Sequence, residues 1–150
     1  MRPYVKALQA RKLPAAAIDL PKSKAERAVS VFIDKVPAGA IAGGHSYGGR
    51  VASMAAVEVG YAALILLSYP LHRPGHPDDL RTEHWPKIRC PVLLLSGESD
   101  PFARVDLLRA SVRLLPQAEL VTFPRVGHGL LPVIDAVMDR VAGFVRGLRS

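Results

Sequence analysis

The sequence Gly44-His45-Ser46-Tyr47-Gly48 places a serine between two glycines, each two residues away. The apolar residues 38–42 precede it, and a helix-like stretch, residues 50–59, follows. A serine on such a sharp turn between strand and helix has a strained backbone and an exposed hydroxyl group. We expect a Cβ at either glycine to collide with facing backbone. The motif favours Ser46 as a nucleophile over a plain glycine turn, with the Tyr47 N–H as an oxyanion donor.

A serine hydroxyl group needs a base to remove its proton, and that base is usually a histidine held by a carboxylate. Asp100 follows residues 92–96, which read as a strand, and precedes Pro101, which keeps the turn out of a helix. His128 follows the next apolar run, residues 120–123, and lies between two glycines. We predict that Asp100 is the acid and His128 the base. Open alternatives are a turn aspartate at Asp100, Glu98 as the acid, and a helix-capping role for His128.

The order of apolar and polar segments predicts the elements that position these residues. Several apolar runs are continuous, which is typical of parallel strands covered on both faces. We expect one domain, residues 1–150, with an α/β fold and a parallel sheet of about five strands flanked by helices. The predicted strands are 15–20, 38–44, 62–67, 91–96 and 119–123, and the predicted helices are 3–13, 24–35, 48–59, 103–115 and 131–148. Ser23 and Glu26 have the spacing of a capping box.

The long connection 68–90 contains prolines at positions 70, 74, 77 and 86 and is expected on the active-site side. Tyr69, His72 and Trp85 in this connection are candidates for the wall of a substrate pocket. Phe102, which lies outside the connection, is a fourth candidate. Trp85 is equally compatible with a plug packed on the sheet edge. His72 and His76 have the spacing of a metal pair on a helix, but the neighbouring prolines oppose a helix, so no metal is expected. Within the motif, His45 is expected to point away from Ser46 by strand alternation.

Composition narrows the class of protein. The formal net charge is +7, but the basic residues are spread over the chain, which does not favour nucleic-acid binding. A single cysteine, Cys90, favours a reducing compartment. Residues 1–12 lack the apolar core of a secretory signal, and no apolar run is long enough to cross a bilayer. We expect a cytoplasmic protein that needs no cofactor, acts on a small acyl compound and has no membrane partner; self-association stays open.

These motifs together resemble the α/β-hydrolase superfamily. More narrowly, the chain is similar to small, uncapped dienelactone-hydrolase-like proteins that have a testis-expressed eukaryotic homologue. The narrower match rests on five segments: 44–54, 69–75, 80–84, 97–102 and 127–128. The resemblance implies a triad of Ser46, Asp100 and His128. Dienelactone hydrolases use cysteine at the nucleophile position, so Ser46 argues against their own chemistry.

The resemblance also implies a strand that the chain does not supply. In the family fold this strand lies between the strands predicted at 15–20 and 38–44 and precedes the first helix. The loop after it gives the second oxyanion donor. The chain starts where that helix starts, so we expect a sheet without the N-terminal strands. Three outcomes stay open: a truncated start, a sheet that closes without the strand, or another chain in the gap. An unfilled gap leaves unpaired strand edges.

Two function hypotheses follow from the residues. The first is a serine hydrolase that cleaves a small ester through an acyl-enzyme. The second is a catalytically weak or inactive scaffold that keeps the fold for partner binding; the lack of a second oxyanion donor favours it and the complete triad opposes it.

Overall fold

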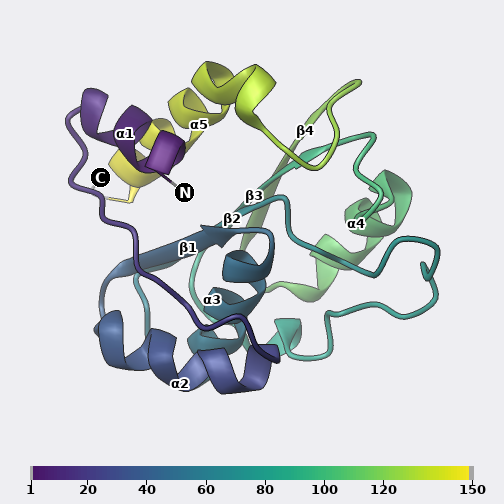
Figure 1. Ribbon diagram of the computed structural model, residues 1–150, viewed down its shortest axis with the longest axis horizontal. Helices are drawn as coiled ribbons and strands as arrows, with labels where there is room; N and C mark the ends of the chain where they lie inside the picture. Colours follow the sequence, from purple (N-terminus) through teal and green to yellow (C-terminus); the bar gives the residue numbers. More distant parts are fainter. Residues whose placement is uncertain (1, 149–150) are drawn as a thin grey trace.

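The computed structural model describes residues 2–148 and contains a parallel sheet with helices on both faces (Figure 1). The strands are β1 (Ile41–His45), β2 (Ala63–Leu67), β3 (Val92–Gly97) and β4 (Ala118–Phe123), in the order β1-β2-β3-β4. The α-helices are α1 (Arg2–Ala10), α2 (Ala25–Lys35), α3 (Tyr47–Glu58), α4 (Val105–Ser111) and α5 (Ile134–Gly147). Short 3-10 turns lie at Trp85–Lys87, Val112–Leu114 and Leu131–Val133. The predicted α/β architecture is confirmed.

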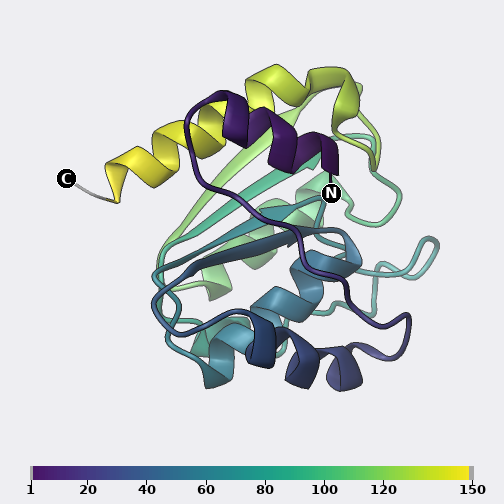
Figure 2. The same ribbon diagram turned by 60° about the vertical axis from the view of Figure 1, so that its left-hand side comes forward.

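The sheet separates two apolar layers, as the continuous apolar runs predicted. In β3, Val92 and Leu94 pack into the layer formed with α2 and α3. Leu93 and Leu95 pack into the opposite layer, formed with α1 and α5. Figure 2 shows α1 and α5 together on one side of the sheet and α2 and α3 on the other. Because all strand pairs are parallel, the segments that follow β1, β3 and β4 leave the sheet at the same edge.

The strand predicted at residues 15–20 is wrong, and the sheet of the described residues has four strands rather than five. The segment runs between α1 and α2 without strand pairing. Ile18 and Leu20 still pack against the core, and Lys35 Nζ donates a hydrogen bond to the carbonyl oxygen of Asp19 at 3.0 Å. A strand requires a neighbour for its N–H and C=O groups, and none lies beside this segment in residues 2–148. The apolar side chains of this segment therefore pack against the core, but its backbone does not pair with a strand of the sheet.

Strand β1 forms one edge of the sheet and borders a cavity of about 510 Å³. Ala40 and Ser46 hydrogen-bond to the β2 side at 2.9 and 2.8 Å. Alternate residues of a strand face opposite neighbours, so the N–H and C=O groups of Ile41, Gly43 and His45 face away from β2. Within residues 2–148 these groups have no backbone partner. The cavity lies where the resemblance implied a further strand, and its other walls come from residues 13–16, α1 and α5.

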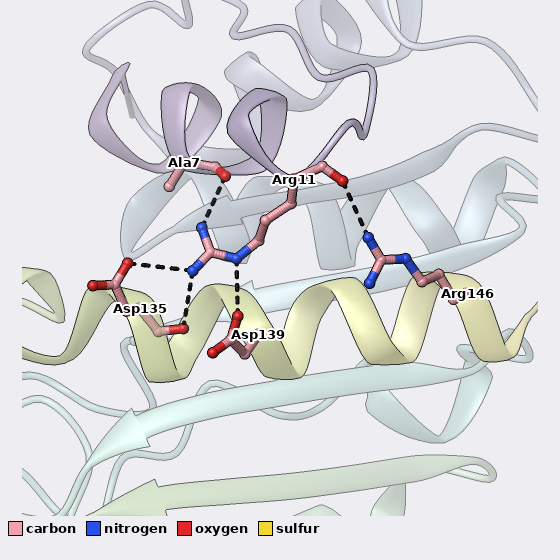
Figure 3. A network of polar contacts seen from close by, with 5 residues as sticks. All are labelled: Ala7, Arg11, Asp135, Asp139 and Arg146. Atoms are coloured by element: carbon pink, nitrogen blue, oxygen red, sulfur yellow. Dashed lines mark hydrogen bonds and ion pairs between the residues drawn. The ribbon is translucent and has the colours of Figure 1, made fainter.

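A polar network fixes the direction of α1 on α5 (Figure 3). Arg11 Nε donates to Asp139 Oδ1 at 3.0 Å, and its Nη2 donates to Asp135 Oδ1 at 3.2 Å. Its Nη1 donates to the Ala7 carbonyl oxygen, and Arg146 donates to the Arg11 carbonyl oxygen at 3.1 Å. The side chains of Asp135 and Asp139 are 89% and 72% exposed, so these pairs contribute little to stability. They orient α1, and apolar packing between the two helices holds it.

The predicted capping box at Ser23 and Glu26 is wrong. Lys24 takes the N-cap position of α2, and there is no side-chain cap hydrogen bond there. The Ser23 carbonyl oxygen instead accepts a hydrogen bond from the Tyr47 hydroxyl group at 2.7 Å, and the Pro21 carbonyl oxygen accepts from the same hydroxyl group at 3.2 Å. This tertiary contact, which local sequence does not encode, sets the path of the chain into α2 and brings residues 21–23 beside α3.

The longest helix, α5, has 14 residues. None of the helices within residues 2–148 combines the length and the apolar character that crossing a bilayer requires.

Candidate active site

Ser46 lies between β1 and α3 with φ 54° and ψ −120°. A residue other than glycine in this region carries about 1–3 kcal/mol of strain, so its surroundings must hold it there. A Cβ at Gly44 would lie 2.6 Å from Gly49 N and would overlap the backbone of Gly48. A Cβ at Gly49 would lie 2.9 Å from Gly44 O, whereas one at Gly48 would meet nothing within 4 Å. The close approach is between Gly44 and the start of α3, and the collision predicted at Gly48 is wrong.

The structure brings the three predicted triad residues together. Ser46 Oγ is 2.7 Å from His128 Nε2, and His128 Nδ1 is 2.8 Å from Asp100 Oδ2. The side chain of Asp100 is fully buried and that of His128 is 26% exposed. Because a carboxylate only accepts, the proton of neutral His128 lies on Nδ1, which leaves Nε2 free to accept the hydroxyl proton of Ser46.

Asp100 also makes the turn contact that was its alternative role. Its second oxygen, Oδ1, accepts the backbone N–H of Phe102 at 2.8 Å, so one carboxylate fixes the loop and orients His128. Glu98, the competing acid, is engaged elsewhere. It accepts a hydrogen bond from Thr122 Oγ1 at 2.8 Å and lies 3.6 Å from Arg109.

Two of the predicted site residues border the triad. The ring of Phe102 lies 4.5 Å from that of His128, with an angle of 35° between their planes. Tyr47 is the first residue of α3, so its backbone N–H is one of the donors that a helix leaves free at its start. Phe102 thus forms one wall beside the imidazole, and Tyr47 offers a donor next to the serine.

Tyr69 and Trp85, two pocket candidates from the long connection, lie in the core. Tyr69 is 2% exposed and Trp85 is fully buried. Their rings meet edge to face at 5.0 Å, and the Tyr69 hydroxyl group donates to the carbonyl oxygen of Arg81 at 2.6 Å. The structure therefore places Trp85 as a packed plug, the second of its two predicted roles.

His72 is also buried and supports the loop that carries Asp100. Its backbone N–H donates to the Phe102 carbonyl oxygen at 3.0 Å, and its Nε2 accepts the Arg104 N–H at 3.1 Å. Its Nδ1 donates to the carbonyl oxygen of Arg73 at 2.9 Å, so both ring nitrogens are engaged. Nowhere in the described part of the chain do three His, Cys, Asp or Glu side chains gather as a metal site would require.

The long connection is tied to α3 by a half-buried histidine. His84 Nε2 lies 2.8 Å from Ser53 Oγ, whose hydroxyl group donates to the Arg50 carbonyl oxygen at 2.7 Å. The hydroxyl proton is used in that bond, so His84 Nε2 carries the proton that Ser53 accepts. Burial, with a smaller contribution from the charge of Arg50, lowers the pKa of His84 to about 4. The folded state thus prefers neutral His84.

We expect the free energy of unfolding to fall as the pH drops from about 6.5 to about 4. In this window His84 is protonated in the unfolded chain but not in the folded one, so protons favour unfolding. A full shift of this size corresponds to about 3 kcal/mol, and partial exposure reduces the expected loss to about 1–2 kcal/mol. Urea unfolding of the parent and of His84→Gln measures it. Equal pH slopes for the two proteins would contradict the assignment.

The contact of His45 with the loop of His128 was not predicted. The structure places its Nε2 3.3 Å from the carbonyl oxygen of His128, on the same loop that Ser46 contacts. The expectation that His45 points away from Ser46 assumed that strand alternation continues, but the positive φ of Ser46 ends the alternation at this residue. The pattern of apolar and polar residues in one sequence cannot indicate a hydrogen bond between His45 and the distant His128 backbone.

Comparison with known proteins agrees with this fold. Residues 3–139 match the family described as alpha/beta hydrolase domain. The monoacylglycerol lipase of Paleococcus ferrophilus is 14% identical with a TM-score of 0.77, over 94% of this chain and 88% of that one. A thermophilic esterase of Thermogutta terrifontis is 18% identical with a TM-score of 0.68, over 99% and 86%. The dienelactone hydrolase of Anabaena variabilis is 24% identical with a TM-score of 0.54, over 67% and 45%. At these identities the structures show a shared fold, and the family match shows that this chain belongs to the alpha/beta hydrolase domain family.

Proposed function

We propose that this protein is a serine hydrolase that cleaves a small ester or a related acyl compound through an acyl-enzyme. One observation carries the proposal: the continuous hydrogen-bonded chain from Ser46 Oγ through the imidazole of His128 to the buried carboxylate of Asp100. This arrangement of nucleophile, base and orienting acid is the one that acyl transfer requires. Its three members come from the ends of three different strands.

In the first half-reaction Ser46 Oγ attacks the carbonyl carbon and its proton passes to His128 Nε2. The carboxylate of Asp100 stabilises the imidazolium that forms and keeps the ring in place. His128 then gives this proton to the oxygen of the leaving alcohol as the carbon–oxygen bond breaks. The acyl group remains on Ser46. In the second half-reaction water attacks this acyl group, His128 takes the proton of the water, and the acid leaves as Ser46 Oγ regains a proton.

The negative charge that develops on the carbonyl oxygen needs donors. The Tyr47 N–H at the start of α3 is the first donor that we assign, and the helix dipole has the correct sign there. The resemblance to the α/β-hydrolase superfamily implies a second donor from the loop after a further strand on the open side of β1. Loss of one donor lowers kcat by about 10²- to 10³-fold, so weak turnover is compatible with the triad.

The esterase and lipase among the structural neighbours support a hydrolase of this type. They leave the acyl group and the leaving group unspecified, because the identities of 14% and 18% carry only the fold. The second candidate is a scaffold with little or no activity. Strand β1 ends at His45, next to Ser46, and within residues 2–148 its outer side has no backbone partner, which is the observation that favours this candidate.

A fluorophosphonate probe separates the two candidates. Ser46 Oγ displaces fluoride and forms a bond to phosphorus only if His128 removes its proton. We expect labelling of the parent protein, no labelling of Ser46→Ala, and retained labelling of Ser30→Ala, an exposed serine on α2. Folding of each protein is checked by circular dichroism. A folded parent that does not react supports the scaffold.

A further inference from the structure

The loop that carries His128 has little internal constraint. Gly127 and Gly129 flank the histidine, and a Cβ at either would meet nothing within 4 Å. Neither glycine has a positive φ, so their backbone conformation does not demand glycine. Glycine increases the conformational freedom that folding must remove. The position of the imidazole therefore depends on contacts between this loop and the rest of the protein.

One side of the loop is fixed by the end of β3. Ser99 N donates to the carbonyl oxygen of Val126 at 2.9 Å. A Cβ at Gly97 would overlap the carbonyl oxygens of Val126 and Gly127, so the loop backbone rests directly on the strand. These contacts involve residues that precede His128 in the chain, whereas the fully buried side chain of Leu130 anchors the chain after it.

The other side is fixed by two aromatic residues from distant elements. His45, at the end of β1, has its Nε2 3.3 Å from the carbonyl oxygen of His128. The hydroxyl group of Tyr4, on α1, accepts the backbone N–H of Leu130 at 3.3 Å. The rings of Tyr4 and His45 stack at 5.5 Å with 23° between their planes. The two side chains thus support each other while each holds one backbone group of the loop.

The chemistry of His45 fits a positioning role. A carbonyl oxygen only accepts, so His45 Nε2 must carry a proton in this contact. Burial lowers the pKa of His45, which favours the neutral ring beside His128. Because its Nε2 is directed at the His128 backbone, His45 does not serve as an alternative base for Ser46.

We propose that His45 and Tyr4 are positioning residues that hold the backbone of residues 128–130 so that the His128 imidazole stays within hydrogen-bond distance of Ser46. This inference rests on the proposed hydrolase function for its kinetic part. A displacement of about 1 Å in a catalytic group lowers the rate by about 10²-fold. Loss of either contact is expected to act on kcat, because neither residue touches the acyl group in the proposed mechanism.

The first test is kinetic and uses p-nitrophenyl acetate. His45→Leu removes the donor and keeps an apolar side chain, whereas His45→Gln retains an N–H donor. We expect kcat to fall about 10- to 100-fold in His45→Leu with KM nearly unchanged, and partial rescue in His45→Gln. A purely structural role would give equal losses in both variants, and unchanged kcat in both would overturn the proposal.

The second test does not require activity. Tyr4→Phe keeps the ring and removes the hydroxyl acceptor, so amide hydrogen exchange at Leu130 is expected to be at least about tenfold faster. Tyr61→Phe is the matched control, since the Tyr61 hydroxyl group bonds to Val36, in a part of the fold away from this loop. If the parent has no hydrolase activity but Leu130 exchanges faster in Tyr4→Phe, the positioning role of Tyr4 is supported and the proposed hydrolase function is contradicted. Unchanged exchange at Leu130 in Tyr4→Phe would overturn the proposed positioning role of Tyr4. If His45→Leu does not fold, both kcat and amide exchange at Leu130 are measured on Tyr4→Phe.

Discussion

Replacement of Asp100 by asparagine is expected to lower kcat for p-nitrophenyl acetate by about 10⁴-fold while the protein stays folded. The asparagine Oδ1 can still accept the Phe102 N–H, so the turn is retained. The amide NH₂ group then faces His128 Nδ1 in place of the carboxylate oxygen. Nδ1 must accept from it, and the imidazole proton moves to Nε2, where it prevents His128 from accepting the proton of Ser46.

Glu98→Gln is the matched control for this prediction. Glu98 lies two residues away in the same loop, but its contacts are with Thr122 and Arg109. We expect its kcat to stay within a few-fold of the parent, with both variants checked by circular dichroism. A large loss in Glu98→Gln together with a small loss in Asp100→Asn would show that the acid is assigned to the wrong residue.

Replacement of Gly44 by alanine is expected to lower the free energy of unfolding by at least about 3 kcal/mol or to prevent folding. The new methyl group would meet the backbone of Gly48 and Gly49, which cannot move without displacing the start of α3. Because Ser46 lies between these segments, any accommodation also moves its hydroxyl group. Urea denaturation followed by circular dichroism measures the loss.

Gly48→Ala provides the contrast. No atom lies within 4 Å of the Cβ that would be added, and Gly48 belongs to the first turn of α3. Alanine is favoured over glycine in a helix by about 0.5–1 kcal/mol, so this variant is expected to be as stable as the parent or slightly more stable. Equal destabilisation by the two substitutions would contradict the packing described for this turn.

Much of the fold and the candidate site was predictable from the sequence, because the relevant signals are local. Continuous apolar runs at 62–67 and 91–96 indicated strands covered on both faces, and both strands are present. Chemically suitable residues followed three such runs. Since parallel strands end at one edge of the sheet, Ser46, Asp100 and His128 could be expected to meet, and the structure places them in contact.

The remaining features depend on contacts between distant residues. Residues 15–20 have an apolar pattern, but a strand forms only beside a partner, and pairing is not a property of the segment itself. Ser23 has the residue type of an N-cap, yet its carbonyl group is held by Tyr47, so the helix begins later. The burial of Trp85 depends on its packing against Tyr69. The sequence alone therefore could not decide whether Trp85 lines a pocket or fills the core.

The most direct test of the central claim is to find the acyl group on the protein. Mixing the parent with p-nitrophenyl acetate, stopping the reaction with acid within the first turnover and mapping peptides by mass spectrometry should place one acetyl group on Ser46. The same experiment on His128→Gln should leave Ser46 unmodified. Turnover of the ester by the parent without acetylation of Ser46, or equal acetylation of Ser46 in His128→Gln, would contradict the account.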